Sequence, residues 1–269
     1  MRYARLVLFV VVAFRLSGGQ ARAQIALGQH TSVSANTGGA CAVDTSVTTS
    51  SITTSATGST FVLLIGVTAT LNTISDSKSN SYTTIGSNTS AWGVTNIRAY
   101  VTNGTGGASH TFTVTTTGGA CISIIAIEIT GADTTASLDK SAQGNDGATP
   151  FDSPDTATLA QANEMLIGYA EDDSNGGTCM YGAGNGFTLV ESMTASDRIS
   201  ATSAYKIVAS TAGDHASFTD TGCNATQMDV STDTFKEAAG GAATPCRLGV
   251  LGVGCDWAAT PMTMLGVDR

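Results

Sequence analysis

Two glutamates in strand-like segments are the residues of this chain best suited to acid–base chemistry. Glu128 lies in the apolar run IIAIEIT, and Glu171 ends the run MLIGYAE. Two such carboxyls can cleave a glycosidic bond when they lie about 5 Å apart, or about 6.5–9.5 Å apart with water between them. The chain has only five glutamates and no Glu-x-Asp-x-x-Glu motif. A glycoside hydrolase or lyase is therefore the alternative interpretation, and hydrogen-bonded structural carboxylates are the simpler one.

Oxygen-rich turns make calcium the one cofactor that the sequence suggests, because Ca²⁺ takes about six to eight oxygen ligands. A first group follows a strand and comprises Glu171, Asp172, Asp173 and Asn175. A second group, Asp76-x-Lys78-x-Asn80, has alternating spacing, but Lys78 occupies a position where an oxygen is needed. An Asx-type hairpin turn explains either group without a metal.

Exposed aromatic rings can stack on the face of a sugar, and Trp92 and Tyr181 are the candidates here. Trp92 follows a polar loop in SNTSAWGVT, which favours its exposure. Aromatic residues are only 6% of the chain, so most rings are needed for a core. The sequence contains no Gly-x-Ser-x-Gly motif, which argues against a serine hydrolase.

The N-terminal segment has the order of a secretory signal peptide. Two arginines precede the apolar run Leu6–Phe14, and Ala21-Arg22-Ala23 favours cleavage before Gln24. The run is shorter than the roughly 20 residues that cross a bilayer, and Arg15 interrupts it, which argues against an uncleaved anchor. We expect a secreted protein, extracellular or periplasmic, with no membrane span after cleavage.

The charge of the mature chain limits its partners. Cleavage removes four arginines and leaves eight basic residues against 21 acidic ones, a net charge of −13. Nucleic acids and anionic membrane surfaces attract clusters of Lys and Arg, so neither is expected as a partner. A polysaccharide or a cell-surface glycan is compatible with this charge.

All six cysteines lie after the signal segment, which predicts disulfides in an exported protein. They are Cys41, Cys121, Cys179, Cys223, Cys246 and Cys255. Six cysteines allow fifteen pairings. The closeness of Cys246 and Cys255 indicates a small local loop, and Cys41–Cys121 and Cys179–Cys223 are the pairings that we favour for the rest.

The body of the chain has the pattern of a β-sandwich, with short strands between turns rich in Gly, Asn, Asp and Ser. The strand candidates are Phe61–Thr70, Trp92–Thr102, His110–Thr116, Cys121–Thr130, Glu164–Ala170, Phe187–Met193, Ile199–Ala209 and Met228–Phe235. Residues 24–58 are rich in Thr and Ser and are expected to add one or two edge strands.

An internal repeat relates two halves of this body. SYTTI at 81–85 corresponds to GFTLV at 186–190, AYV at 99–101 to AYK at 204–206, and His110 to His215. Two units of about four strands, each too small to close its own core, predict one jelly-roll-like antiparallel β-sandwich. The two histidines then begin equivalent strands, and we expect them to be structural.

The chain therefore divides into a signal peptide at 1–23, a β-sandwich domain at 24–237 and a C-terminal segment at 238–269. This last segment begins with a Gly/Ala linker and continues as an apolar tail with the local disulfide. The tail either packs on the sandwich or serves in self-assembly, because exposed apolar surface favours association.

Several of these segments occur together in one family. They are FVLLI at 61–65, ISDSKSNSYT at 74–83, IEITGADTTASLD at 127–139, NEMLI at 163–167 and GNGFT at 184–188. They resemble a largely uncharacterised family of secreted bacterial jelly-roll-like β-sandwich domains with a TDSxGNxY and SGxDTTxxLD pattern. The resemblance spans roughly residues 59–237, departs at Lys78, where glycine is usual, and does not cover the tail. It implies the fold and no activity.

These observations favour a secreted non-catalytic β-sandwich protein for extracellular binding, adhesion or assembly, with carbohydrate as a candidate ligand. The alternative is a carbohydrate-active enzyme that uses Glu128 and Glu171. The distance between the two carboxyls distinguishes these interpretations, because the enzyme needs both carboxyls in one cleft.

Overall fold

The computed structural model describes residues 24–35, 44–90, 93–172, 180–193, 199–221, 227–239, 246–247 and 254–255. Within these ranges the chain is all-β, and we find no helix with the length and apolar character that a membrane crossing requires. Ala23–Ala239 forms one compact unit. The segment predicted as a signal peptide and most of the C-terminal segment lie outside the described residues.

Each half of the compact unit contributes eight strands in the same order. The first half comprises β1 (Ala26–Ser34), β2 (Ser46–Thr48), β3 (Ser59–Val67), β4 (Leu71–Asp76), β5 (Thr83–Thr89), β6 (Thr95–Gly104), β7 (Phe112–Thr116) and β8 (Ile122–Thr130). The second half comprises β9 (Leu138–Asp146), β10 (Phe151–Asp152), β11 (Glu164–Asp172), β12 (Met180–Ala183), β13 (Thr188–Met193), β14 (Ser200–Val208), β15 (Ser217–Thr221) and β16 (Met228–Lys236). The predicted edge strands before residue 58 are β1 and β2.

The two halves have the same topology. The first half forms sheets of order β1-β8-β3-β6-β5 and β2-β7-β4, and the second forms β9-β16-β11-β14-β13 and β10-β15-β12. Every strand of the first half thus has its counterpart eight strands later. The all-β antiparallel sandwich built from two repeat-related halves is confirmed, but a unit has eight strands rather than about four. The sequence pattern missed short polar strands such as β4, β5 and β12, because they carry no apolar run.

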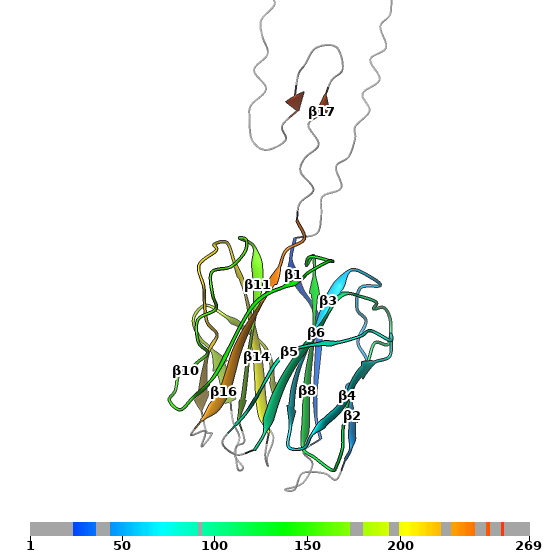
Figure 1. Cartoon of the computed structure of the whole chain (residues 1–269), viewed down its shortest axis with the longest axis vertical. Coiled ribbons are helices and arrows are strands. Elements are labelled where there is room, and N and C mark those ends of the chain that lie inside the picture. Colours follow the sequence, from blue (N-terminus) through cyan, green and yellow to red (C-terminus); the bar gives the residue numbers. More distant parts are fainter. Residues whose placement is uncertain are drawn as a thin grey trace, which may run out of the picture. The chain divides into compact units, whose positions relative to one another are not determined.

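Each half closes its own core, contrary to the expectation that a single repeat would be too small. Phe61 and Leu63 of β3 lie in the core of the first sandwich, and Leu166 of β11 lies in the core of the second. A third core lies between the two five-stranded sheets, where Val62 of β3 and Ile167 of β11 pack together with their neighbours. The unit therefore has four layers, with the five-stranded sheets facing each other in the middle (Figure 1).

Strands in the middle layers are buried on both faces, which explains their unbroken apolar sequences. All nine residues of β3 are buried, whereas β7, in an outer sheet, alternates between buried and half-buried positions. Strands that are covered on both sides read as continuous hydrophobic runs, and strands with one solvated face alternate.

The register of the strands confirms the predicted repeat. Val62 lies opposite Tyr100 in the β3–β6 pair, and Ile167 lies opposite Tyr205 in the β11–β14 pair. The edge strands of the facing sheets also meet in equivalent pairs: β1 contacts β13, and β5 contacts β9. The two sandwiches therefore pack as a pseudo-symmetric pair within one chain.

A separate short pair of strands lies in the C-terminal segment. Here β17 (Cys246–Arg247) pairs with β18 (Gly254–Cys255), and the backbone of Cys246 lies directly opposite that of Cys255. The disulfide between these two cysteines stays a prediction.

Candidate functional site

A groove opens on the side of the first sandwich where its two sheets are not joined. It exists because β5 pairs with β6 in the five-stranded sheet, which leaves β4 at the edge of the three-stranded sheet. The groove has a volume of about 530 Å³. It is lined by Thr68, Ala69, Thr70, Leu71, Thr84, Ser87, Thr95 and Ile97.

Strand register places the hydroxyl groups of β5 in the groove. Thr84 lies opposite Ala99 and Ser87 lies opposite Ile97, so both share the face of the sheet from which Ile97 enters the first core. Both β5 residues are exposed to solvent. The connection from β3 to β4, residues 68–70, and the first residue of β4, Leu71, supply the other wall.

The lining defines what the groove can do chemically. Five of its eight residues carry a hydroxyl, three are apolar and none is ionisable. Thr68 Oγ1 accepts a hydrogen bond from Cys121 N at 2.9 Å. The hydroxyls of Thr70, Thr84 and Ser87 make no hydrogen bond with any described residue and so remain available. The groove can therefore hold a neutral polar ligand, but it offers no general acid or base.

The second half repeats this lining only in part on its equivalent strand. Leu189 of β13 lies opposite Ala204, as Thr84 of β5 lies opposite Ala99. An exposed leucine thus replaces an exposed threonine at the equivalent position. The hydroxyl of Thr84 is therefore a departure from the repeat, whereas Ser87 has an equivalent serine, since Ser192 lies opposite Thr202 as Ser87 lies opposite Ile97.

Glu128, one of the two predicted catalytic candidates, is a buried residue whose carboxylate holds separate segments of the chain together by hydrogen bonds. It is 2% exposed. Its Oε1 accepts hydrogen bonds from Ser55 N at 2.8 Å and Ser59 Oγ at 2.7 Å, and its Oε2 accepts one from Gln29 N at 3.2 Å. These bonds join β8 to β1, to the start of β3 and to the segment before it, which is the structural role considered as the simpler interpretation.

Glu171, the other candidate, does not lie near Glu128. Its carboxylate lies against Gly66, on the face of β3 that points to the central core. Glu128 lies opposite Phe61, on the other face of the same sheet. Five residues of strand separate these two positions, roughly 17 Å at about 3.3 Å per residue. The two carboxyls therefore do not form the pair that a glycosidase needs.

The two described members of the predicted calcium group after β11 do not point to a common site. Glu171 and Asp172 are both buried and are consecutive strand residues, so their side chains point to opposite faces. Asp173 and Asn175 lie outside the described residues. Among the residues that the structure describes, no three His, Cys, Asp or Glu side chains are placed to hold a metal ion together.

The two predicted sugar-stacking rings have different outcomes. Tyr181 is 7% exposed and lies in the core of the second sandwich, so it presents no ring face to a ligand. Burial raises the pKa of its hydroxyl, and the charge of Asp172 raises it further. Trp92 lies outside the described residues and stays a prediction.

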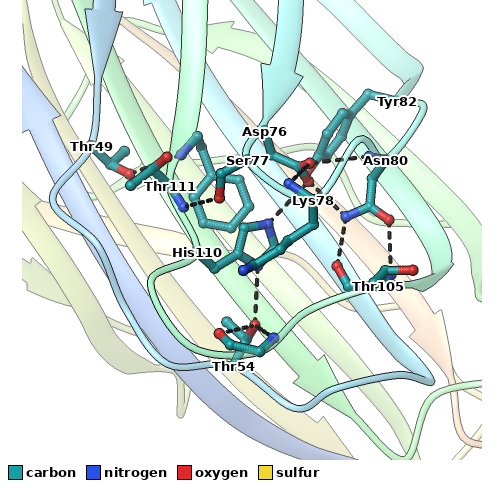
Figure 2. A network of polar contacts seen from close by, with 12 residues as sticks. Thr49, Thr54, Asp76, Ser77, Lys78, Asn80, Tyr82, Thr105, His110 and Thr111 are labelled. Carbon is teal, nitrogen blue, oxygen red and sulfur yellow. Dashed lines mark hydrogen bonds and ion pairs between the residues drawn. The ribbon is translucent and has the colours of Figure 1, made fainter.

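Asp76 is the centre of a buried polar network at the end of β4 (Figure 2). Its Oδ2 accepts hydrogen bonds from Tyr82 Oη at 2.7 Å, Asn80 Nδ2 at 2.7 Å and His110 Nε2 at 3.1 Å. Its Oδ1 accepts the backbone N–H groups of Lys78 at 2.9 Å and Asn80 at 3.0 Å. Burial acts to raise the pKa of Asp76, but the bonds from His110, Asn80 and Tyr82 hold it well below its usual range. This is the Asx turn that was the alternative to a calcium loop.

The same network resembles a nucleophile triad without being accessible as one. Thr54 Oγ1 lies 3.0 Å from His110 Nδ1, which completes a hydroxyl–imidazole–carboxylate chain with Asp76. Thr54 is 6% exposed, and the side chains of His110 and Asp76 are fully buried. The ring of Phe61 packs edge-on against His110 at 4.8 Å. Because no substrate can reach this hydroxyl, the chain of contacts is structural.

The second sandwich has polar contacts of a similar kind, but they are more exposed. Asn185 Nδ2 donates to Asp214 Oδ1 at 2.8 Å, and Lys206 Nζ donates to Asp214 Oδ2 at 2.7 Å. His215 Nδ1 lies 2.7 Å from Asp155 Oδ1. His110 and His215 therefore each contact a carboxylate next to equivalent strands, but only the side chain of His110 is buried in a core.

Cysteine placement is described for part of the chain. Cys121 is fully buried and disulfide-bonded. Cys41, Cys179 and Cys223 lie outside the described residues, so the pairings Cys41–Cys121 and Cys179–Cys223 stay predictions.

No protein-family model, curated protein or solved structure matches this chain.

Proposed function

We propose that this protein is a secreted, non-catalytic binding protein whose groove takes a neutral polyhydroxylated ligand, such as a segment of a polysaccharide or of a cell-surface glycan. The composition of the groove lining carries the proposal: it combines hydroxyl and apolar side chains and contains no ionisable group. Sugar hydroxyls can exchange hydrogen bonds with Thr84 and Ser87, and the apolar faces of a sugar ring can rest on Leu71 and Ile97.

Secretion is proposed from two features of the chain. The first two dozen residues have the charge, apolar run and small residues of a signal peptide. The disulfide at Cys121 is typical of an oxidising compartment. Adhesion follows if the glycan belongs to a surface.

A carbohydrate-active enzyme is the competing proposal, and the separation of Glu128 from Glu171 disfavours it. A polysaccharide-hydrolysis screen of the mature protein, with the variants Glu128→Gln and Glu171→Gln, tests this directly. Hydrolysis that is lost in either variant would replace binding by catalysis as the function.

The binding proposal is tested with the mature protein on a glycan array, followed by calorimetry on the best ligand. The double variant Thr84→Val/Ser87→Ala removes two hydroxyls and preserves strand propensity. Each lost hydrogen bond is worth about 1 kcal/mol, so we expect the Kd to rise about tenfold or more.

A matched control lies one residue away on the same strand. Thr83 is exposed but points to the opposite face of β5, so Thr83→Val should leave the Kd unchanged. Equal affinity in the double variant and in the control would refute the groove as the binding site. Trp92→Ala forms a separate arm, because Trp92 precedes the groove residue Thr95 by three positions.

Self-assembly through residues 238–269 is the second function that we retain from the sequence. The apolar character of this segment supports it. Size-exclusion chromatography of the mature protein with and without residues 238–269 decides it, since an unchanged oligomeric state would remove assembly from the proposal.

A further inference from the structure

One carboxylate of the second sandwich holds an amine and a carboxamide side by side. Lys206 Nζ donates to Asp214 Oδ2 at 2.7 Å, and Asn185 Nδ2 donates to Asp214 Oδ1 at 2.8 Å. Lys206 Nζ also donates to the backbone oxygen of Asn185 at 2.8 Å. The amine therefore lies beside the residue that carries the amide. We call Lys206, Asn185 and Asp214 the amine–amide cluster.

A tight turn between β12 and β13 fixes the position of Asn185. Phe187 N donates to Gly184 O at 2.9 Å, which closes the turn, and Asn185 within it has a left-handed backbone conformation with a φ of 49°. Its side-chain nitrogen donates to Asp214 and also to the backbone oxygen of His215 at 2.8 Å. The turn and these two hydrogen bonds therefore hold the amide in one place and one orientation.

The pairing of β13 with β14 brings the amine of Lys206 to this turn. Its Nζ lies 5.5 Å from the centre of the Phe187 ring, which is buried. A β-carbon added to Gly186 would lie 3.7 Å from the same Nζ. The side chain of Lys206 is 24% exposed and that of Asp214 is 20% exposed, so the amine is only partly open to water. Lys206 is thus held against the turn that carries Asn185.

Asp214 is placed to move a proton between its two partners. Burial acts to raise its pKa, but the hydrogen bonds from Lys206, from the backbone of His215 and from Asn185 hold the pKa below its usual range. Asp214 is therefore ionised and can accept a proton. Because one oxygen contacts the amine and the other contacts the amide, a proton received from Nζ can be passed to Nδ2.

We propose that the amine–amide cluster forms an intramolecular isopeptide cross-link between Lys206 and Asn185. The uncharged amine attacks Cγ of Asn185, a Nζ–Cγ bond forms, the Cγ–Nδ2 bond breaks, and ammonia leaves. Asp214 takes one proton from Nζ and gives one to Nδ2, so the carboxylate is regenerated and the reaction needs neither an oxidant nor a cofactor. The product joins the β12–β13 turn covalently to β14.

The cross-link closes residues 185–206 into a loop. A covalent loop restricts the unfolded chain as a disulfide does, so the Tm of the cross-linked protein should be higher by about 5 °C or more. Only the uncharged amine is a nucleophile, so the ion pair of Lys206 with Asp214 is the unreactive resting form. Freshly purified protein at neutral pH should therefore carry the ion pair, and the cross-link should accumulate faster at pH 9 than at pH 7.

The first sandwich supplies an internal comparison. Asn80 Nδ2 also donates to a carboxylate, Asp76 Oδ2, at 2.7 Å, but this carboxylate is paired with His110 and not with an amine. Lys78 Nζ donates to the backbone oxygen of Ala108 instead. Asn80 should therefore keep its amide under conditions in which Asn185 loses it.

Mass spectrometry of the whole mature protein tests the proposal after incubation at pH 9, reduction and alkylation. We expect the chain to lose the mass of one ammonia molecule. Because trypsin does not cleave after a cross-linked Lys206, residues 141–198 and 199–236 should appear as one branched peptide. Reduction is required, because the predicted Cys179–Cys223 disulfide would join the same two peptides. An unchanged mass, or an ammonia loss without the branched peptide, would overturn the proposal.

The variant Lys206→Arg separates the cross-link from a competing reaction. The arginine keeps an ion pair with Asp214 but cannot form the Lys–Asn amide, so the ammonia loss should disappear. Asn185 can also lose ammonia when the backbone nitrogen of Gly186 closes on its Cγ, which gives a succinimide. That reaction does not need Lys206. An ammonia loss that persists in Lys206→Arg would therefore assign the succinimide and overturn the cross-link.

Lys140→Arg is the matched control, and Asp214→Asn tests the proton carrier. Lys140 Nζ pairs with Asp139 Oδ1 at 3.0 Å, but Asp139 Oδ2 accepts the backbone N–H of Ala160 instead of a carboxamide. Lys140→Arg should therefore leave the ammonia loss unchanged, and a loss abolished by it would overturn the assignment to Lys206. Asp214→Asn should slow the ammonia loss about 100-fold, and an unchanged rate would overturn the role of Asp214.

Discussion

Replacing Asp76 by asparagine should destabilise the first sandwich strongly, because the carboxylate accepts five hydrogen bonds in a buried site. The new amide can keep its oxygen toward the backbone N–H groups of Lys78 and Asn80. Its nitrogen then faces three donors, on Tyr82, Asn80 and His110, and loses three bonds to a charged acceptor. At about 1–1.5 kcal/mol each, the loss is about 3–5 kcal/mol in the free energy of unfolding.

Urea denaturation of the wild type and of Asp76→Asn measures this loss. Tyr82→Phe removes one of the three bonds, so it should cost only about 1–2 kcal/mol. Asp214→Asn is the matched control in the second sandwich. The side chain of Asp214 is 20% exposed and its ion pair with Lys206 is close to the surface, so less than about 1 kcal/mol is expected.

The pH dependence gives a second check. The pKa of Asp76 in the folded protein lies well below its usual range, while the unfolded chain has a value near about 3.9. A lowered pKa contributes stability above the unfolded value and loses it as the pH falls toward the folded value. The difference between wild type and Asp76→Asn should therefore be constant from about pH 5 to 8 and shrink below about pH 4. A difference under 1 kcal/mol at neutral pH, or one that grows on acidification, would refute this account.

Two further substitutions test the packing between the sandwiches. Gly66→Ala places a methyl group against the Glu171 carboxylate, so it should lower the free energy of unfolding by about 1–3 kcal/mol in the same urea experiment. Gly118→Ala is the control, because the added methyl group meets open space, and it should change the free energy of unfolding by less than about 0.5 kcal/mol. Arg98→Leu leaves the buried carboxylate of Asp233 without its ion-pair partner and should lower the free energy of unfolding by about 3–5 kcal/mol. The double variant Arg98→Leu/Asp233→Leu should recover part of this loss, and strictly additive effects of the two substitutions would contradict the ion pair.

Short-range pattern was sufficient to predict the longest strands and the repeat. Runs such as FVLLIGV and ISIIAI are apolar because β3 and β8 are covered on both faces, so the sequence carried a clear signal. The alignment of Tyr100 with Tyr205 also held, because equivalent positions in two copies of one fold experience the same neighbours.

Strand number and core closure could not be predicted in the same way. Strands such as β4 and β5 are stabilised by pairing with β7 and β6 rather than by an apolar run, so nothing local distinguishes them from turns. The groove depends on this pairing as well. Thr84 and Ser87 look like ordinary polar residues of a Thr-rich chain until β5 is known to lie away from β4.

The sequence by itself determined the all-β class and the two-fold repeat, because both depend on residue types and their spacing. Tertiary structure alone decided which polar residues are buried. Asp229, Ser231 and Asp233 alternate along β16 as they would on a solvent-facing strand, yet all three are nearly inaccessible. Alternation reveals which residues share a face, but what covers that face is decided by a second sheet from a distant part of the chain.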